Sequence, residues 1–195
     1  MTPPLSDLGI LVIDMQDRFL NPWTNTLADK NLLIKSVQSL LNYAPVARIR
    51  TWLVEYDFEH MGKTVDEITG NCKYPIFGKM NSGAFEQIGV YNYPDSTGSF
   101  YTTCDNILLD EILCHQGIKK LIVAGVCASA CVDRTIKGAR ELGYKVKTAP
   151  ELIANNFVNL KGFNSAQYLD YTLSEYQRTG VLADSWQEAV KELGG

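Results

Sequence analysis

Short, continuous apolar runs alternate along this chain with longer segments whose apolar residues have helical spacing. The first run, Leu8-Gly9-Ile10-Leu11-Val12-Ile13, is typical of a parallel strand buried on both faces. Residues 29–44 follow with apolar side chains at helical spacing, and Pro45 ends that predicted helix. The same reasoning predicts further strands over 46–53, 121–125, 144–148 and 180–183, and helices over 131–142, over 165–177 and after Ser185.

The segment from Val54 to Phe100 shows no long period. Gly, Pro, Asn and Ser recur there among many aromatic residues, which predicts a long, ordered connection with room for a short strand near 99–101. Thr102 and Asp105 then have capping-box spacing ahead of an apolar run. We therefore expect a helix to begin there and to end at Gly117.

Strands that alternate with helices predict an α/β fold, a three-layer α/β/α sandwich with a mostly parallel, Rossmann-like sheet. We expect residues 1–195 to form one domain, because no repeat, linker or low-complexity segment interrupts them. Ligands of such folds bind at the carboxyl ends of the strands. Asp14 directly follows the first strand, and the turn Gly125–Cys131 follows another, so both are expected at that edge.

Cys131 is the first candidate for catalysis, because it lies at the predicted start of a helix. Unpaired backbone N–H groups and the positive end of the helix dipole favour the thiolate, which is the nucleophilic form of cysteine. Ser129 has the side chain of an N-cap. One face of the predicted helix carries the residues expected to be buried, Val132, Thr135, Ile136, Ala139 and Leu142.

Asp14 and Lys79 are candidates for a base and a cation. A carboxylate at a strand end either caps the following turn or acts as a general base in a cleft. A lysine in a loop is normally solvated, but the apolar and small neighbours of Lys79 favour one that turns into a site. Cys127 and Cys131 also fit the role of small buried residues, and their spacing of four leaves a redox pair open.

Composition narrows the classes of function. Hydrophobic residues make up 46% and charged residues 21% of the 195 residues, as in soluble globular proteins. The net charge of −4, without a dense Lys/Arg run, argues against binding to nucleic acid or to an anionic membrane. No apolar stretch approaches the roughly 20 residues that span a bilayer, and no signal-peptide pattern is present, which predicts a cytoplasmic protein.

Cysteine and histidine counts narrow the chemistry further. Five cysteines, an odd number, argue against a disulfide framework. The two histidines, His60 and His115, offer no regular spacing for a zinc site and no convincing partner for a Cys–His dyad. No GxGxxG or phosphate-loop pattern occurs, so nucleotide cofactors have no motif support.

Three blocks of this sequence resemble the isochorismatase-like cysteine hydrolase family. They are Leu11-Val12-Ile13-Asp14-Met15-Gln16-Asp17-Arg18-Phe19, Lys79-Met80-Asn81-Ser82-Gly83-Ala84-Phe85 and Gly125-Val126-Cys127-Ala128-Ser129-Ala130-Cys131-Val132, and the order of elements matches over nearly the whole chain. The resemblance implies that Asp14 takes the thiol proton and that Lys79 stabilises the thiolate and holds Asp14. It implies that Cys131 forms a covalent intermediate with a carbonyl or related carbon, without a cofactor, in a protein that tends to form dimers or tetramers.

The family also has a cis peptide bond shortly before the nucleophile, which in this chain would join Val126 and Cys127. The resemblance implies that the bond directs the N–H of Cys127, together with that of Cys131, at the developing oxyanion. Nicotinamidases of the family bind a metal through an Asp-x-His pattern after the second strand. The corresponding segment, Thr51–Asp57, has no His at that spacing, so we expect no metal. Ser129 stands where many members carry Asp.

These observations converge on a metal-independent cysteine hydrolase that cleaves a C–N bond of a small amide or carbamoyl-type substrate. Phe19, Trp23 and Tyr56 are expected pocket walls, because they follow the carboxyl ends of strands. Isochorismate-type vinyl-ether hydrolysis, which does not need a cysteine, is the alternative within the family. A thiol redox or sensing protein that uses Cys127 and Cys131, and a catalytically silent binding module, are the alternatives outside it.

Overall fold

The computed structural model of the protein describes residues 7–21, 27–70, 72–95, 101–156, 159–160 and 163–194. Its strands are β1 (Leu8–Ile13), β2 (Arg50–Tyr56), β3 (Ile76–Lys79), β4 (Ile88–Pro94), β5 (Tyr101–Leu108), β6 (Lys120–Val126), β7 (Lys145–Lys147), β8 (Ile153–Ala154), β9 (Asn159–Leu160) and β10 (Phe163–Asn164). The first eight form one sheet in the order β5-β4-β3-β2-β1-β6-β7, with β8 paired to β6, and β9 and β10 form a separate antiparallel pair. In the large sheet β4 pairs antiparallel with β3 and β5, and the other pairs are parallel.

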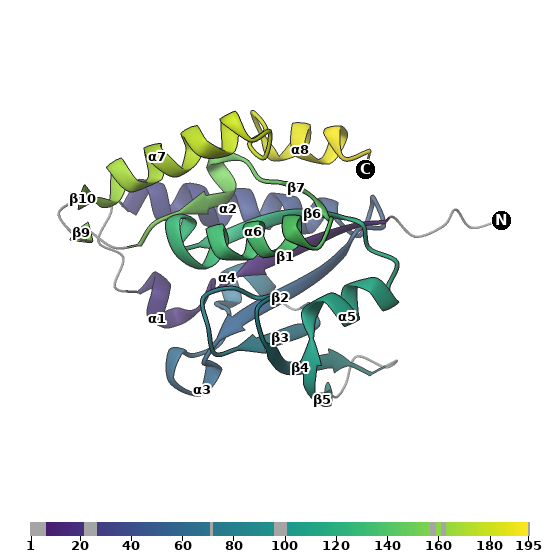
Figure 1. The fold of residues 1–195 in the computed structure, drawn as a ribbon. Helices are drawn as coiled ribbons and strands as arrows, with labels where there is room; N and C mark the ends of the chain where they lie inside the picture. Colours follow the sequence, from purple (N-terminus) through teal and green to yellow (C-terminus); the bar gives the residue numbers. More distant parts are fainter. Residues whose placement is uncertain are drawn as a thin grey trace.

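Helices cover both faces of this sheet. They are α1 (Asp17–Leu20), α2 (Leu27–Tyr43), α3 (Phe58–Met61), α4 (Asp66–Thr69), α5 (Leu109–His115), a π-helix (Ala128–Val132) that continues into α6 (Asp133–Glu141), a 3₁₀-helix (Pro150–Leu152), α7 (Ser165–Arg178) and α8 (Trp186–Glu192). In Figure 1, α2 lies behind the sheet and α5 and α6 lie in front of it. The predicted three-layer α/β/α fold is therefore confirmed. Among the described residues, no helix is both long and apolar enough to cross a membrane.

The central strand β1 and helix α2 form the middle of the core, as their apolar patterns predict. Every residue of β1 is buried, because a parallel strand at the centre of the sheet has a helical layer on each face. The predicted inner face of α2 is also buried and consists of Leu33, Val37, Leu40 and Leu41, and Ala44, directly after the helix, is buried as well. Continuous apolar runs and helical periodicity were therefore sufficient to find these elements.

Parallel pairing brings the ends of distant strands to one edge of the sheet. Ile13, the last residue of β1, lies beside Val54 of β2 and Gly125 of β6. Tyr56, the last residue of β2, lies beside Lys79, the last residue of β3. The residues that leave these strands therefore meet at the carboxyl edge, where ligands of α/β folds bind.

The prediction of one long connection over residues 54–100 is wrong. This segment contains β3, β4 and two short helices, and Lys79 ends a strand instead of lying in a loop. The two strands are short, include Gly and Pro, and β4 is only half-buried, so neither gives the apolar run of a central strand. The short strand expected over 99–101 falls partly outside the described residues, and β5 begins at Tyr101.

The helix predicted to begin at Thr102 and Asp105 is also wrong. Both residues belong to β5, which pairs with β4 from Pro94 back to Ile88, and α5 begins only at Leu109. The cross-strand hydrogen bonds of this hairpin outweigh a local capping signal. The helix does end before Gly117, which has a φ of 71°.

Smaller differences occur at element boundaries. Residues 44–48 form a turn, so the second strand begins at Arg50, and the strand expected over 180–183 is reduced to one bridge between Thr148 and Leu182. Leu142, expected on a buried face, is 52% exposed because α6 ends before it. The cap of the last helix is confirmed, since the Ser185 hydroxyl accepts a hydrogen bond from the Glu188 N–H at 3.2 Å.

Gly125 gives a test of the close contact between β1 and β6. Its φ is 120°, and a Cβ atom there would lie 2.0 Å from the Ile13 carbonyl oxygen. We predict that Gly125→Ala lowers the free energy of unfolding by about 3 kcal/mol or more, through backbone strain and overpacking. Gly143→Ala is the matched control, because Gly143 also has a positive φ but no atom lies within 4 Å of the position that its Cβ would take.

The control should cost only about 1–2 kcal/mol, the cost of the backbone conformation alone. Urea unfolding followed by circular dichroism measures both variants. Equal losses at the two glycines would contradict the contact between β1 and β6.

Candidate active site

Asp14 lies at the end of β1 with its side chain fully buried. Its φ is 51°, the left-handed region that Asp tolerates better than most residues, and its N–H donates to the Val54 carbonyl at 2.8 Å. Such strained positions persist where the surrounding structure fixes them and are frequent at functional sites. The backbone therefore holds this carboxyl group at the sheet edge and away from bulk water.

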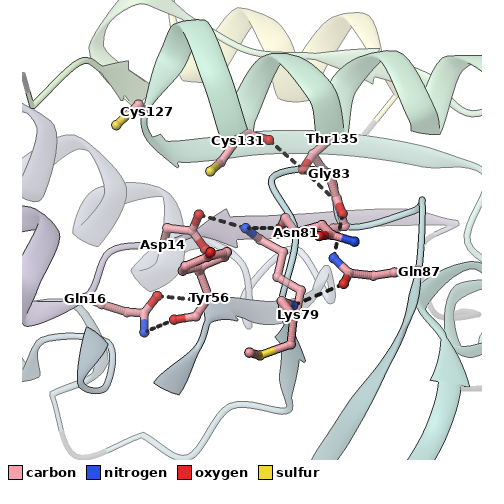
Figure 2. A network of polar contacts seen from close by, with 12 residues as sticks. Asp14, Gln16, Tyr56, Lys79, Asn81, Gly83, Gln87, Cys127, Cys131 and Thr135 are labelled. Carbon is pink, nitrogen blue, oxygen red and sulfur yellow. Dashed lines mark hydrogen bonds and ion pairs between the residues drawn. The ribbon is translucent and has the colours of Figure 1, made fainter. Parts of the chain in front are cut away.

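Lys79 reaches Asp14 from the end of β3. Its Nζ lies 2.9 Å from Asp14 Oδ2, and both side chains are almost completely buried. The same ammonium donates to the Asn81 carbonyl at 3.1 Å and lies 5.0 Å from the centre of the Tyr56 ring. Figure 2 shows this ammonium between the carboxylate and the lysine loop, by which we mean residues 80–87 between β3 and β4. The structure therefore brings Asp14 and Lys79, the candidates for base and cation, together as a buried ion pair. The extra contacts of the ammonium stabilise it.

Gln16 positions Tyr56, and sequence reasoning missed it. The Gln16 amide donates to the Tyr56 carbonyl at 3.0 Å and accepts from the Tyr56 N–H at 2.8 Å, with the side chain fully buried. The Phe19 ring meets the Tyr56 ring edge-on, with centroids 6.3 Å apart. Of the three expected pocket walls, Tyr56 lies beside the ion pair, Phe19 packs against the Tyr56 ring, and Trp23 lies outside the described residues.

Cys131 lies inside the π-helix rather than at its first residue. The helix is closed by the bond from the Val132 N–H to the Cys127 carbonyl at 3.1 Å. One-turn π-helices are rare and occur often at functional sites. In Figure 2 the sulfur of Cys131 points towards Asp14 and Lys79, and the sulfur of Cys127 lies farther away. The structure thus brings the three predicted catalytic side chains together.

The prediction that Ser129 caps this helix is wrong. Its hydroxyl accepts hydrogen bonds from the Asn155 amide at 2.8 Å and the Thr172 hydroxyl at 3.0 Å, and its own N–H donates to Asn155 Oδ1 at 3.0 Å. Ser129 lies inside the π-helix, so its side chain cannot reach the free N–H groups that an N-cap serves. Ser129 instead connects the π-helix to Asn155, the residue after β8, and to Thr172 of α7.

Thr135 joins the nucleophile helix to the lysine loop. Its hydroxyl donates to the Cys131 carbonyl at 2.7 Å and accepts from the Ala84 N–H at 3.3 Å. Gln87 closes the same loop, because its side chain accepts from the Met80 N–H and donates to the Gly83 carbonyl, each at 3.1 Å. These bonds, drawn in Figure 2, fix the distance between two segments far apart in the sequence.

Burial sets the protonation states of the site. The pKa of Asp14 is raised by burial, an effect that the charge of Lys79 opposes. The pKa of the Cys131 thiol is raised to about 12 by burial and by the negative charge of Asp14, again opposed by Lys79. The expectation that the resting thiol is shifted towards the thiolate is therefore wrong. The desolvation cost of a buried anion exceeds the benefit of the helix start and the nearby cation.

One oxygen of Asp14 is left for proton transfer. Oδ2 accepts from Lys79, whereas Oδ1 is buried and has no hydrogen-bond partner among the described residues. The Cys131 thiol faces this carboxyl group in Figure 2. An unpaired, buried carboxylate oxygen beside a protonated thiol can accept the thiol proton. Asp14 Oδ1 is therefore placed to act as the general base for Cys131.

Cys127 has different surroundings. The predicted cis peptide bond between Val126 and Cys127 is present. The Cys127 thiol donates to Asn156 Oδ1 at 2.7 Å, and burial raises its pKa to about 11. Asn156 in turn donates to the Phe19 carbonyl at 2.7 Å. The assignment of the Cys127 and Cys131 N–H groups to an oxyanion hole stays a prediction.

The described residues do not place a histidine beside Cys131. His60 is exposed and its ring lies 2.8 Å from Asp57 Oδ1. The hydrogen bond to Asp57 and the negative charge of Asp57 raise the pKa of His60. This pair lies on the surface, which leaves Asp14 as the acid–base group nearest the thiol.

Comparison with known proteins identifies the family of the chain. The family model of the isochorismatase domain matches residues 9–155. The chain belongs to the isochorismatase-like hydrolase family. No curated protein matches its sequence.

Several solved structures share the fold. A putative isochorismatase from Burkholderia xenovorans LB400 has a TM-score of 0.75 at 15% identity, covering 98% of this chain and 91% of its own. A cysteine hydrolase from Pseudomonas syringae pv. phaseolicola has a TM-score of 0.72 at 16% identity, covering 99% and 100%. The nicotinamidase SaPncA from Staphylococcus aureus has a TM-score of 0.65 at 16% identity, covering 93% and 99%. At these identities the similarity shows the fold alone.

The buried ion pair gives a prediction about stability. Lys79→Met leaves the Asp14 carboxylate buried without a counter-charge, which should lower the free energy of unfolding by about 3–5 kcal/mol. Adding Asp14→Asn removes the remaining charge, so the double variant should regain most of that loss. Urea unfolding at pH 7 measures the four members of this cycle.

The surface pair Lys137–Asp133, with a Lys137 side chain that is 66% exposed, is the control. Lys137→Met should change stability by less than about 1 kcal/mol. If the losses of Lys79→Met and Asp14→Asn simply add, the two side chains are not coupled and the ion pair does not have the role assigned to it.

Proposed function

We propose that this protein is a metal-independent cysteine hydrolase that cleaves a C–N bond of a small amide or carbamoyl-type substrate. The observation that carries the proposal is the buried cluster of the Asp14–Lys79 ion pair with the Cys131 thiol facing it. The family provides the reaction class, hydrolysis. The presence of a nucleophile that ether hydrolysis does not need favours an acyl or carbamoyl carbon.

The first half of the reaction forms a covalent intermediate. As a carbonyl carbon approaches, the Cys131 thiol gives its proton to the free Oδ1 of Asp14 and Sγ bonds to the carbon. Lys79 Nζ compensates the negative charge that moves from the carboxylate to the sulfur. The tetrahedral intermediate then breaks its C–N bond, and Asp14 gives the proton to the departing nitrogen.

The second half restores the enzyme. Water attacks the thioester carbon while Asp14 takes one of its protons, and the thiolate leaves with the electrons of the S–C bond. Cys131 regains the proton from Asp14, so carboxylate and thiol return to their resting states. N–H groups of Cys127 and Cys131 are our candidates for binding the oxyanion in both halves.

The residues after β2 support a reaction without a metal. Within the described ranges, no three His, Cys, Asp or Glu side chains are placed to share a metal ion. The segment Thr51–Asp57, at the end of β2, has no His at the spacing of an Asp-x-His pattern, and His60 contacts Asp57 on the surface. We further propose that the substrate is a small molecule and not a nucleic acid, in line with the net charge of −4, and that the enzyme acts as a homo-oligomer.

Substitution of the nucleophile tests this proposal. A panel of small amides and ureides, monitored by ammonia release, identifies the substrate. On that substrate we predict that Cys131→Ala lowers kcat/KM by at least about 10³-fold, because removal of a nucleophile leaves only binding and electrostatic effects. Cys127→Ala is the control and should lose far less, because the thiol of Cys127 has no bond-forming role here. Full turnover by Cys131→Ala would exclude the covalent mechanism.

The pH dependence of the reaction follows from the buried carboxyl group. Asp14 accepts a proton only when ionised, and burial raises its pKa above the ordinary value of 3.8. Turnover should therefore be lost as the pH falls through that raised pKa, and kcat/KM should show an acid limb with its midpoint above pH 3.8. Asp14→Asn should remove nearly all activity across the range. An acid limb that persists with wild-type rates in Asp14→Asn would assign the titration to another group.

A further inference from the structure

A cavity lies on the face of β2 opposite to the Tyr56 ring. Neighbouring residues of a strand project to opposite faces, so Glu55 points away from the face of Tyr56. The register aligns Leu53 of β2 with Ile76 of β3, and Ile76 with Asn92 of β4, and these residues line the cavity together with Glu55. Its volume is about 390 Å³, within the range of small-molecule sites.

Glu55 is a buried carboxylate without a cation. It is only 3% exposed, and its Oε1 accepts hydrogen bonds from the N–H and the hydroxyl of Thr64, each at 2.8 Å. No Lys, Arg or His of the described residues forms an ion pair with it, and its hydrogen bonds there all end on Oε1. Burying a carboxylate is unfavourable unless a counter-charge or donors satisfy it. Glu55 Oε2 is therefore the atom of this cavity that a hydrogen-bond donor or a cation would stabilise most.

The other walls suit an organic cation. Tyr74 and Tyr101 line the cavity, and the Tyr101 hydroxyl donates to the Tyr74 carbonyl at 3.3 Å. Burial and the negative charge of Glu55 raise the pKa of Tyr101. Lys63 and Asp66, both exposed, contribute opposite charges to the lining, and Glu55 is its buried charge. The Lys73 ammonium lies 5.7 Å from the centre of the Tyr101 ring, so an ammonium group already contacts this wall from the protein itself. Aromatic faces together with one buried carboxylate are the elements that recognise ammonium groups.

We propose that this cavity binds a small organic cation with a primary ammonium group. The ammonium donates to Glu55 Oε2 and supplies the missing counter-charge, and the apolar part of the ligand lies against Tyr74 and Tyr101. Glu55 and Tyr56 project to opposite faces of the sheet, so the ligand of this cavity does not contact the Tyr56 ring, although the charge of Glu55 is close enough to contribute to the raised pKa of Asp14. Binding in this cavity does not depend on the function proposed for Cys131.

Ligand-dependent thermal stability and calorimetric titration test this proposal on the full chain. Benzylammonium chloride is the probe, and benzyl alcohol, which has nearly the same shape without the charge, is the control at the same ionic strength. We expect saturable binding and a rise of Tm with benzylammonium, and no rise with benzyl alcohol. Equal effects of the two compounds, or none from benzylammonium, would overturn the proposal.

Three variants locate the binding. Glu55→Gln keeps an acceptor for Thr64 but removes the charge, so the affinity for benzylammonium should fall by at least about tenfold. Asp66→Asn, at the exposed part of the lining, should keep it within about twofold. If Glu55→Gln does not fold, Tyr101→Leu removes an aromatic wall and should weaken binding instead. Undiminished affinity of Glu55→Gln or Tyr101→Leu, or a Tm rise with MgCl₂ but not with benzylammonium, would contradict an organic cation at this site.

Discussion

The buried ion pair between Asp14 and Lys79 is the interaction on which the site depends. Its two residues are 65 positions apart and meet only because β1, β2 and β3 are parallel neighbours that end at the same edge. Removing charges from water is costly, so the pair persists only with good geometry and further contacts. The Asn81 carbonyl and the Tyr56 ring provide those contacts, and Gln16 holds Tyr56 in place.

The same burial decides how the nucleophile is generated. In water a thiol beside a lysine and a helix start would lose its proton more easily. Here desolvation and the charge of Asp14 outweigh both effects, and the pKa of Cys131 rises to about 12. The thiol is therefore neutral at rest, and the thiolate forms only as its proton moves to Asp14. Thr135, which bonds both the Cys131 carbonyl and the lysine loop, keeps donor and acceptor at a fixed separation.

The sequence was sufficient for elements and side chains whose signal is local. The apolar run of β1, the periodic face of α2 and the candidates Asp14, Lys79 and Cys131 could all be found this way. The resemblance of three blocks added the roles of these side chains and the cis peptide bond. The hairpin of β4 and β5 could not be found, because its stability comes from pairing across the sheet, whereas Thr102 and Asp105 carry a local helix signal.

Residues that act through tertiary contacts were also missed. Gln16, Thr135 and Glu55 are polar residues that look ordinary in the sequence, and only burial and hydrogen-bond partners distinguish them. Gln16 could have been found from its position, because a polar residue two positions after the strand-terminal Asp14 lies at the same edge of the sheet. The raised pKa of Cys131 needs the depth of burial, which helical position alone does not reveal.

The central claim is that Cys131 becomes covalently attached to the substrate. Rapid acid quench of the working enzyme, followed by intact-mass and peptide mass spectrometry, tests it most directly. The account predicts an added mass equal to the acyl or carbamoyl part of the substrate, located on the peptide with Cys131 and absent in Cys131→Ser. Steady turnover with no adduct at any quench time, or an adduct on Cys127 alone, would contradict it.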